Sequence, residues 1–168
     1  MNLTAKFKGY SGVDYIFEYS DADSFDNLEK TKCTQTYGVC FCDGKILIVF
    51  NSIKKAWGLV GGTIEKGESL EETLKREIQE ESNMEVVSFL PVGYQKIIDT
   101  RDNSYAYQLR YVCTVKPYGE FISDPAGKIT EIKLIDSKDY KQYFDWGEIG
   151  ERILKRAEEL LPKLRHSS

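Results

Sequence analysis

The most constraining feature of the sequence is an acidic segment that also has the spacing of a buried helix. Residues 62–85 contain eight acidic and three basic side chains. Ser69, three residues before a glutamate, forms a capping-box pattern, which predicts that a helix begins there. Leu70, Leu74 and Ile78 recur every four residues, as in a helix that packs one face against a core. The segment is therefore expected to fold as a helix with acids on a partly buried surface.

Helical geometry places three glutamates beside this apolar stripe. At about 100° per residue, Glu81 falls within the apolar arc, Glu77 lies at its edge and Glu80 lies on the far side of Glu77. Several like charges on such a surface are costly unless a cation neutralises them. Carboxylates at this spacing suit Mg²⁺ or Mn²⁺. The pattern predicts a divalent-metal site, and the alternative is a helix that turns its acids to solvent.

The loop before the helix is rich in glycine. Gly61 and Gly62 end a short strand, and Gly67 precedes the helix. Glycine lets a backbone approach a ligand closely, and its carbonyl oxygen can bind a cation. Glu68 follows Gly67 where a phosphate-binding P-loop would have lysine. The loop is therefore expected to hold a metal rather than a bare phosphate, and the alternative is a turn without a ligand.

Composition excludes several other classes of protein. The chain has 27 acidic residues against 23 lysines and arginines, which argues against a long nucleic-acid partner. Its lone histidine, His166, leaves no serine–histidine or cysteine–histidine catalysis. No apolar run approaches the ~20 residues of a membrane span and no secretory signal is visible, so we expect a cytoplasmic protein. The four cysteines lack metal-binding spacing and are expected to be reduced and buried.

The flanking segments predict an α/β fold in a single domain, residues 1–168. Asn83 is expected to end the first helix, and a second amphipathic helix is expected from Asp145 to Pro162. Residues 1–32 are expected to form an N-terminal β-hairpin and loop, and residues 163–168 a flexible tail. The strands are predicted at residues 3–10, 13–19, 36–42, 45–51, 57–60, 86–98, 105–115 and 128–135.

Residues 61–84, GGTIEKGESLEETLKREIQEESNM, resemble the Nudix box, Gly-x5-Glu-x7-Arg-Glu-U-x-Glu-Glu-x-Gly-U, where U is a bulky apolar residue. One position departs from this pattern, because Asn83 stands where the family has glycine. Asparagine is the best substitute for glycine at a left-handed helix end, so we expect little effect. The matching positions are Gly62, Glu68, Arg76, Glu77, Ile78, Glu80, Glu81 and Met84.

The resemblance implies an α/β/α sandwich, with a mixed sheet between helices and an extra N-terminal hairpin. It implies a Mg²⁺- or Mn²⁺-dependent hydrolase of a nucleoside diphosphate linked to another group. Glu68 and Arg76 would pair and brace the loop against the helix. Members of the family are often dimers, so a homodimer is one expected assembly. The implied metal ligands are Gly62, Glu77, Glu80 and Glu81.

A carboxylate has to take a proton from the attacking water, and the sequence leaves its identity open. Glu77 is one candidate. Many family members supply another carboxylate from a loop before the last strands, where this chain has Glu120, Asp124 and Glu131. We favour Glu131 and place Glu120 next. A surface role is an equally good interpretation for each of these three.

The substrate is the least constrained part of the interpretation. Aromatic side chains that could stack on a nucleobase are Trp57, Tyr37, Phe50 and Tyr107, although each could instead belong to the core. Chain size and the N-terminal hairpin resemble nucleoside-triphosphate pyrophosphatases, including those that act on oxidised nucleotides. The alternatives are hydrolysis of ADP-ribose, dinucleoside polyphosphates or NADH, a catalytically silent nucleotide-binding module, and a Ca²⁺-stabilised structural protein.

Overall fold

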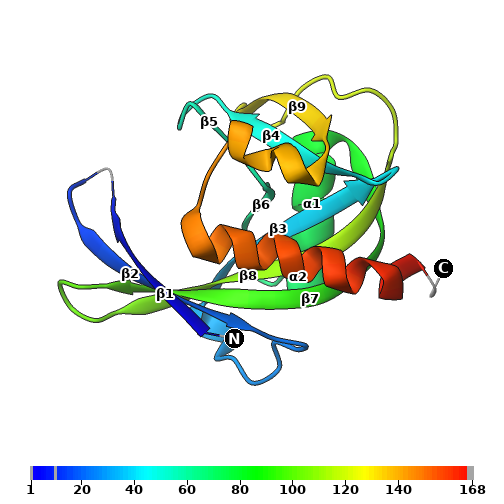
Figure 1. Cartoon of the computed structure of the whole chain (residues 1–168). Helices are drawn as coiled ribbons and strands as arrows, with labels where there is room; N and C mark the ends of the chain where they lie inside the picture. Colours follow the sequence, from blue (N-terminus) through cyan, green and yellow to red (C-terminus); the bar gives the residue numbers. More distant parts are fainter. Residues whose placement is uncertain (1, 10, 166–168) are drawn as a thin grey trace.

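The computed structural model describes residues 2–9 and 11–165, which form one mixed sheet with a helix on each side (Figure 1). Over these residues the sheet has nine strands. The strands are β1 Asn2–Lys8, β2 Asp14–Asp21, β3 Cys33–Cys42, β4 Lys45–Asn51, β5 Ala56–Gly58, β6 Val60–Thr63, β7 Met84–Asp99, β8 Tyr105–Pro117 and β9 Ile129–Ile135. The helices are α1 Leu70–Ser82 and α2 Gly147–Arg165, with 3-10 turns η1 Lys30–Lys32 and η2 Ser137–Gln142.

The strand order is β1-β2-β7-β8-β3-β4-β5, with β6 paired to β3 and β9 paired to β4. β3 and β8 run parallel and the other pairs are antiparallel, so the prediction of a mixed sheet is confirmed. The N-terminal hairpin does not stand apart, because β2 pairs along the distal half of β7, from Gly93 to Asp99. The hairpin therefore extends the main sheet.

The two helices cover opposite faces of the sheet and create two cores. On one face, Leu74 and Ile78 of α1 are fully buried against side chains that include Val60 of β6. On the other face, α2 buries Ile153 and Ala157 against alternate residues of β3, β4 and β8. Figure 1 shows α2 lying in front of the sheet and α1 behind it. The predicted α/β class and sandwich architecture are confirmed.

The first helix begins and ends where its sequence predicts. The Ser69 hydroxyl accepts a hydrogen bond from the Glu72 amide at 3.1 Å, and the Glu72 carboxylate accepts one from the Ser69 amide at 3.4 Å. Asn83 ends the helix in the left-handed conformation, with φ 56° and ψ 39°. Asparagine therefore does here what glycine does in the family pattern.

The second helix is longer than the sequence suggests. Proline was expected to end it at Pro162, and this was wrong, because α2 continues to Arg165. A helix interior tolerates proline at a cost, since one backbone hydrogen bond is lost. The burial of Leu164, only 3% exposed, favours the extra turn. Residues 163–165 are therefore helical rather than tail, whereas 166–168, including His166, lie outside the described residues.

The predicted bounds of one strand and one loop also need correction. The strand expected over residues 57–60 is two strands, β5 and β6, which separate at Leu59 because β5 pairs with β4 whereas β6 pairs with β3. The loop expected over residues 20–32 is shorter, because β2 continues to Asp21 and η1 begins at Lys30.

The cysteines and the helices give two further findings. All four cysteines are free and buried, as expected. Within the described part of the chain, neither helix is long and apolar enough to cross a membrane.

Candidate active site

A salt bridge holds the loop before α1 against the helix. Arg76 Nε donates to Glu68 Oε2 at 2.6 Å, and Arg76 Nη2 donates to Glu68 Oε1 at 2.9 Å. Arg76 Nη2 also donates to the Thr63 carbonyl at 3.1 Å, where β6 ends. The guanidinium lowers the pKa of Glu68 to about 2. The predicted pairing of Glu68 with Arg76 is therefore present, and it ties β6, the loop and α1 together.

The same guanidinium reaches two further carboxylates of α1. Arg76 Nη1 donates to Glu77 Oε1 at 3.0 Å and to Glu80 Oε2 at 3.2 Å. Within residues 2–9 and 11–165, no three carboxylate, thiolate or imidazole side chains are grouped closely enough to hold a metal ion. Arg76 thus takes up the oxygens that the sequence assigns to a metal, and Glu77 and Glu80 would have to exchange this partner to become ligands.

The glycine pair fits closely around two of these carboxylates. The Gly61 amide donates to Glu81 Oε1 at 2.9 Å. A Cβ atom added at Gly62 would lie 2.5 Å from the Glu77 carboxyl carbon and 2.6 Å from Oε1. A side chain at position 62 would therefore occupy the space in front of the Glu77 carboxylate. The space between the glycine pair and these carboxylates is lined by oxygen atoms, which are the ligands that a divalent cation prefers.

Burial makes the negative charges on α1 unfavourable. It raises the pKa of Glu81 to about 8, and the nearby charges of Glu77 and Asp124 add to this shift. Burial also raises the pKa of Glu77, although Arg76 opposes the effect. These are the consequences expected where like charges lie close together away from water. A cation at this position would return both groups to their ionised form.

A loop after β8 adds one more carboxylate to the cluster. Asp124 is 7% exposed, and its carboxylate accepts hydrogen bonds from the amides of Ala126, Lys128 and Ile129 at 3.0–3.1 Å. These bonds shape the turn into β9. The charge of Asp124 is among those that raise the pKa values of Glu77 and Glu81. Of the three candidates from this region, Asp124 is the one coupled to the cluster.

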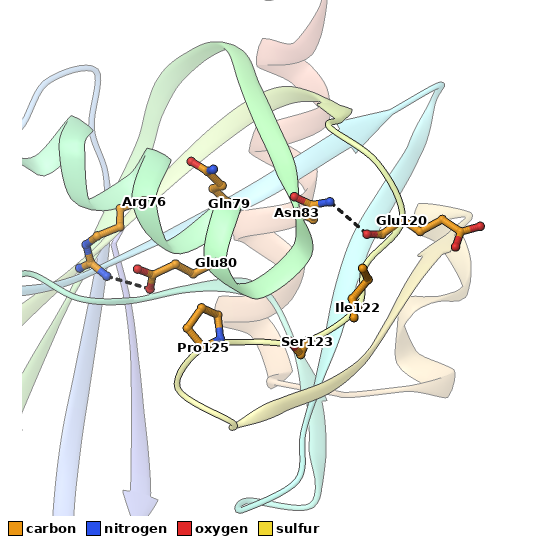
Figure 2. A pocket seen from close by; sticks show the side chains of 8 residues that line it. All are labelled: Arg76, Gln79, Glu80, Asn83, Glu120, Ile122, Ser123 and Pro125. Carbon is orange, nitrogen blue, oxygen red and sulfur yellow. Dashed lines mark hydrogen bonds and ion pairs between the residues drawn. The ribbon is translucent and has the colours of Figure 1, made fainter.

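The other two candidates lie differently. Figure 2 shows the Glu120 side chain pointing away from α1, while its carbonyl oxygen accepts a hydrogen bond from Asn83 Nδ2 at 3.0 Å. Glu131 is exposed on β9, opposite Phe50 of β4, and its predicted role as a base is not tested by these contacts. A cleft of about 410 Å³ separates this loop from α1, and both Arg76 and Glu80 line it.

The four aromatic candidates do not form one site. The rings of Trp57 and Phe50 pack at 5.4 Å, and Tyr143 adds an edge contact to Trp57 at 5.7 Å. Tyr37 lies at the glycine edge, where the charges of Glu81 and Glu77 raise the pKa of its phenol in addition to burial. Tyr107 packs with tyrosines on the α1 side of the sheet. Of these four aromatic side chains, Tyr37 is thus the one that interacts electrostatically with the carboxylates of α1.

Sequence reasoning missed a buried arginine beside Tyr37. Arg110 of β8 is 5% exposed, and its guanidinium carbon lies 4.7 Å from the centre of the Tyr37 ring. Its Nε and Nη1 atoms have no hydrogen-bond partner in the described part of the protein. The available signal was a single charge within the otherwise uncharged and mostly apolar run from Leu109 to Val115.

Comparison with known proteins identifies this arrangement. A family model described as the NUDIX domain matches residues 34–157, most of the chain. The chain belongs to the NUDIX family. As a NUDIX hydrolase it is an enzyme that acts on pyrophosphate bonds. The match begins at β3, so the N-terminal hairpin lies outside it.

Solved structures share the NUDIX fold at low sequence identity. The pyrophosphohydrolase BsRppH of Bacillus subtilis is 17% identical, with a TM-score of 0.68, and the alignment covers 92% of this chain and 96% of that one. A MutT NUDIX hydrolase from Burkholderia pseudomallei is 18% identical, with a TM-score of 0.58 and coverage of 73% and 95%. No curated protein sequence matches the chain. These likenesses support the fold alone.

Proposed function

We propose that this NUDIX hydrolase cleaves nucleoside triphosphates, oxidised nucleotides included, in a divalent-metal-dependent reaction that releases a nucleoside monophosphate and pyrophosphate. The observation that carries the proposal is the half-buried set of acids against the Gly61–Gly62 edge, with one internal cation, Arg76, to neutralise it. A polyanionic substrate cannot approach such a surface unless metal ions bridge the two. The names of the MutT and pyrophosphohydrolase neighbours motivate the choice of substrate.

Four groups would hold the cation, and all come from β6 and α1. They are the Gly62 carbonyl and the carboxylates of Glu77, Glu80 and Glu81. A bound divalent cation would neutralise the pyrophosphate and lower the pKa of the attacking water. Asp124, fixed by three backbone amides, is the carboxylate outside α1 that we assign to the same cluster.

The remaining residues of the motif position these groups. Glu68 holds Arg76 through two hydrogen bonds, so Arg76 would stay beside Glu77 and Glu80 when a cation replaces it as their partner. Glu77 lies in front of Gly62 and is our first candidate for the base that accepts the proton from water. Glu131 is the second candidate, and a Glu131→Gln variant that keeps full activity would eliminate it.

The proposal is tested with a substrate panel in the presence of Mg²⁺, of Mn²⁺ and of a chelator. The panel contains NTPs, oxidised dNTPs, ADP-ribose, NADH, dinucleoside polyphosphates and nucleotide sugars, and products are identified by mass spectrometry. We expect monophosphate and pyrophosphate from triphosphates, and no turnover in the chelator. Faster cleavage of ADP-ribose or of dinucleotides would overturn the substrate assignment.

Matched variants separate the metal site from the helix that carries it. Glu81→Gln is expected to lower kcat about 10²–10³-fold, the usual cost of removing one electrostatic contact to a transition state. Glu71→Gln, on the exposed side of the same helix, should keep wild-type activity. Nucleotide binding with no turnover of any panel member would instead indicate a silent binding module.

A further inference from the structure

Arg110 is the strongest unexplained feature outside the carboxylate cluster. It extends from β8 on the α2 side of the sheet, one strand away from the glycine edge, because Tyr37 of β3 is in register with both Arg110 and Gly61. Burial lowers the pKa of Arg110, and no carboxylate of the described residues is among the charges that act on it. A buried cation without a counter-charge is costly. An apolar side chain at position 110 would avoid this cost, so a role for the charge in binding a ligand is worth testing.

The side-chain oxygens of Gln108 and Gln35 beside Arg110 already accept two hydrogen bonds each, whereas two donor atoms of Arg110 are unused. Gln108 Oε1 accepts from Arg110 Nη2 at 3.2 Å and from Gln95 Nε2 at 3.5 Å. Gln35 Oε1 accepts from Gln108 Nε2 at 2.6 Å and from the Tyr37 hydroxyl at 3.0 Å. Arg110 Nε and Nη1 have no hydrogen-bond partner among residues 2–9 and 11–165. The network therefore presents hydrogen-bond donors to a ligand.

The network also reaches both the surface and the proposed active site. Gln35 and Gln108 are half-buried, so a ligand can approach beside Arg110. Tyr37 contacts the Arg110 guanidinium with its ring and is coupled electrostatically to Glu77 and Glu81. A nucleotide whose phosphates lie at the Gly61–Gly62 edge therefore has this donor-rich surface next to its nucleoside half.

We propose that Arg110, with Gln35 and Gln108, recognises an oxo group on the base of the nucleotide substrate and discriminates against an amino group at the same position. This inference rests on the proposed function, because the phosphates are what place the base. A carbonyl oxygen accepts the hydrogen bonds that Arg110 offers, whereas an amino group brings two donors of its own. Tyr37 supplies the ring beside which the base lies.

Inosine and adenosine nucleotides test this most directly, since they differ only at position 6, oxo or amino, and in the hydrogen on the adjacent N1. We expect kcat/KM for ITP to exceed that for ATP by about 10–100-fold, the range of one good hydrogen-bonded contact to a base. In Arg110→Met the ratio should fall to near one. Arg101→Met, in the exposed turn between β7 and β8, is the control and should keep the wild-type ratio.

Stability distinguishes recognition from a structural role. Because Arg110 is buried without a counter-charge, Arg110→Met should keep or raise the melting temperature. A lower melting temperature together with an equal loss of activity towards ITP and ATP would overturn the proposal. An equal loss without destabilisation would also overturn it, since that result indicates a phosphate contact.

A binding experiment separates this inference from the proposed activity. Isothermal titration with IMP and with AMP in the presence of Mg²⁺ requires no turnover, because neither ligand has a pyrophosphate bond to cleave. Tighter binding of IMP that disappears in Arg110→Met supports the inference even if no triphosphate is hydrolysed. Equal affinities in the wild type, with ATP and ITP hydrolysed equally well, would leave the proposed function intact and refute base recognition by Arg110.

Discussion

The two helices each carry an arginine–carboxylate cluster, and the two clusters differ in charge balance. On α1, Arg76 alone faces Glu65, Glu68, Glu77 and Glu80 at 2.6–3.8 Å. On α2, two arginines face three acids: Arg152 meets Asp21 at 2.6 Å and Glu159 at 4.0 Å, and Arg156 meets Asp23 at 2.7 Å. The α2 cluster has two cations for three acids, whereas the α1 cluster has one cation for four acids. A cluster whose arginines nearly match its acids can hold two elements together. A cluster with a large excess of acid is suited to bind a cation.

The largest effect is expected when the single cation of the α1 cluster is removed. In Arg76→Met the nearby acids lose their shared partner, so we expect kcat to fall by about 10²-fold or more. The free energy of unfolding should fall by about 2–4 kcal/mol, because a partly buried ionic network loses one member. Activity assays and chemical denaturation measure the two effects.

Added metal should partly restore this variant. Excess Mg²⁺ can neutralise the acids that Arg76 no longer reaches, so it should raise the melting temperature of Arg76→Met more than that of the wild type. No rise in either protein would argue against a metal at this cluster, and an equal rise would show that metal does not take the place of Arg76.

The α2 cluster should respond in stability but not in chemistry. Asp21→Asn removes one member of the best-paired bridge, whose side chains are only 14–16% exposed. We expect the free energy of unfolding to fall by about 1–3 kcal/mol. The kcat of the folded variant should stay at the wild-type value, because the Arg152–Asp21 pair joins α2 to β2 and does not contact the carboxylates of α1. A loss of kcat at full stability would contradict the division of roles between the two clusters.

The acid excess also predicts how metal binding depends on pH. The pKa of Glu81 in the metal-free fold is raised to about 8, so below that pH the carboxyl holds a proton that a cation must displace. Apparent Mg²⁺ affinity should therefore rise by up to about tenfold per pH unit from pH 6 to pH 8 and level off above it.

The sign of the stability effect follows from the same shift. Because folding raises the pKa of Glu81, ionisation is less favourable in the folded state, and this group makes the metal-free protein less stable as pH rises from about 4.5 to 8. Titration calorimetry of Mg²⁺ in two buffers of different ionisation enthalpy counts the released protons. Affinity that does not change with pH would show that Glu81 is ionised without metal.

The difference between the clusters also explains what could be read from the sequence. Local signals predicted α1 well, because the Ser69 cap, the apolar stripe and Asn83 all act within one helix. Helical periodicity likewise predicted that Glu77 and Glu81 lie at the buried edge. The ion pair between Arg152 of α2 and Asp21 of the hairpin was not predictable. The two residues are 131 positions apart in the chain and come together only in the folded protein.

Residues whose environment depends on tertiary contacts could not be ranked from the sequence, or were missed. Asp124 stood as one of three candidate acids until the turn into β9 brought its charge close to Glu77. Arg110 was overlooked because a charged residue in a strand reads as solvent-facing, whereas here alternation points it to the covered α2 side. The position of Pro162 misled in the opposite sense, since packing of Leu164 outweighs the lost hydrogen bond.

The smallest expected effect concerns the one position where the chain departs from the family motif. Asn83 has two functions: its left-handed backbone ends α1, and its side chain donates to the Glu120 carbonyl at 3.0 Å. Asn83→Gly should relieve the backbone while losing that hydrogen bond, so the two effects nearly cancel and stability should change by less than about 1 kcal/mol. Asn83→Ala loses both and should be destabilised by about 1–2 kcal/mol.

The same pair of variants tests whether the loop after β8 belongs to the α1 cluster. The hydrogen bond from Asn83 ties this loop to the end of α1, four residues before Asp124. In Asn83→Gly the loop loses this side-chain bond and keeps the backbone bond from the Tyr118 amide to the carbonyl of residue 83. Mg²⁺ affinity should therefore weaken about two- to threefold although stability is kept, a change that corresponds to well under 1 kcal/mol. Unchanged affinity would place Asp124 outside the metal-binding group and return the choice of the additional carboxylate to Glu131.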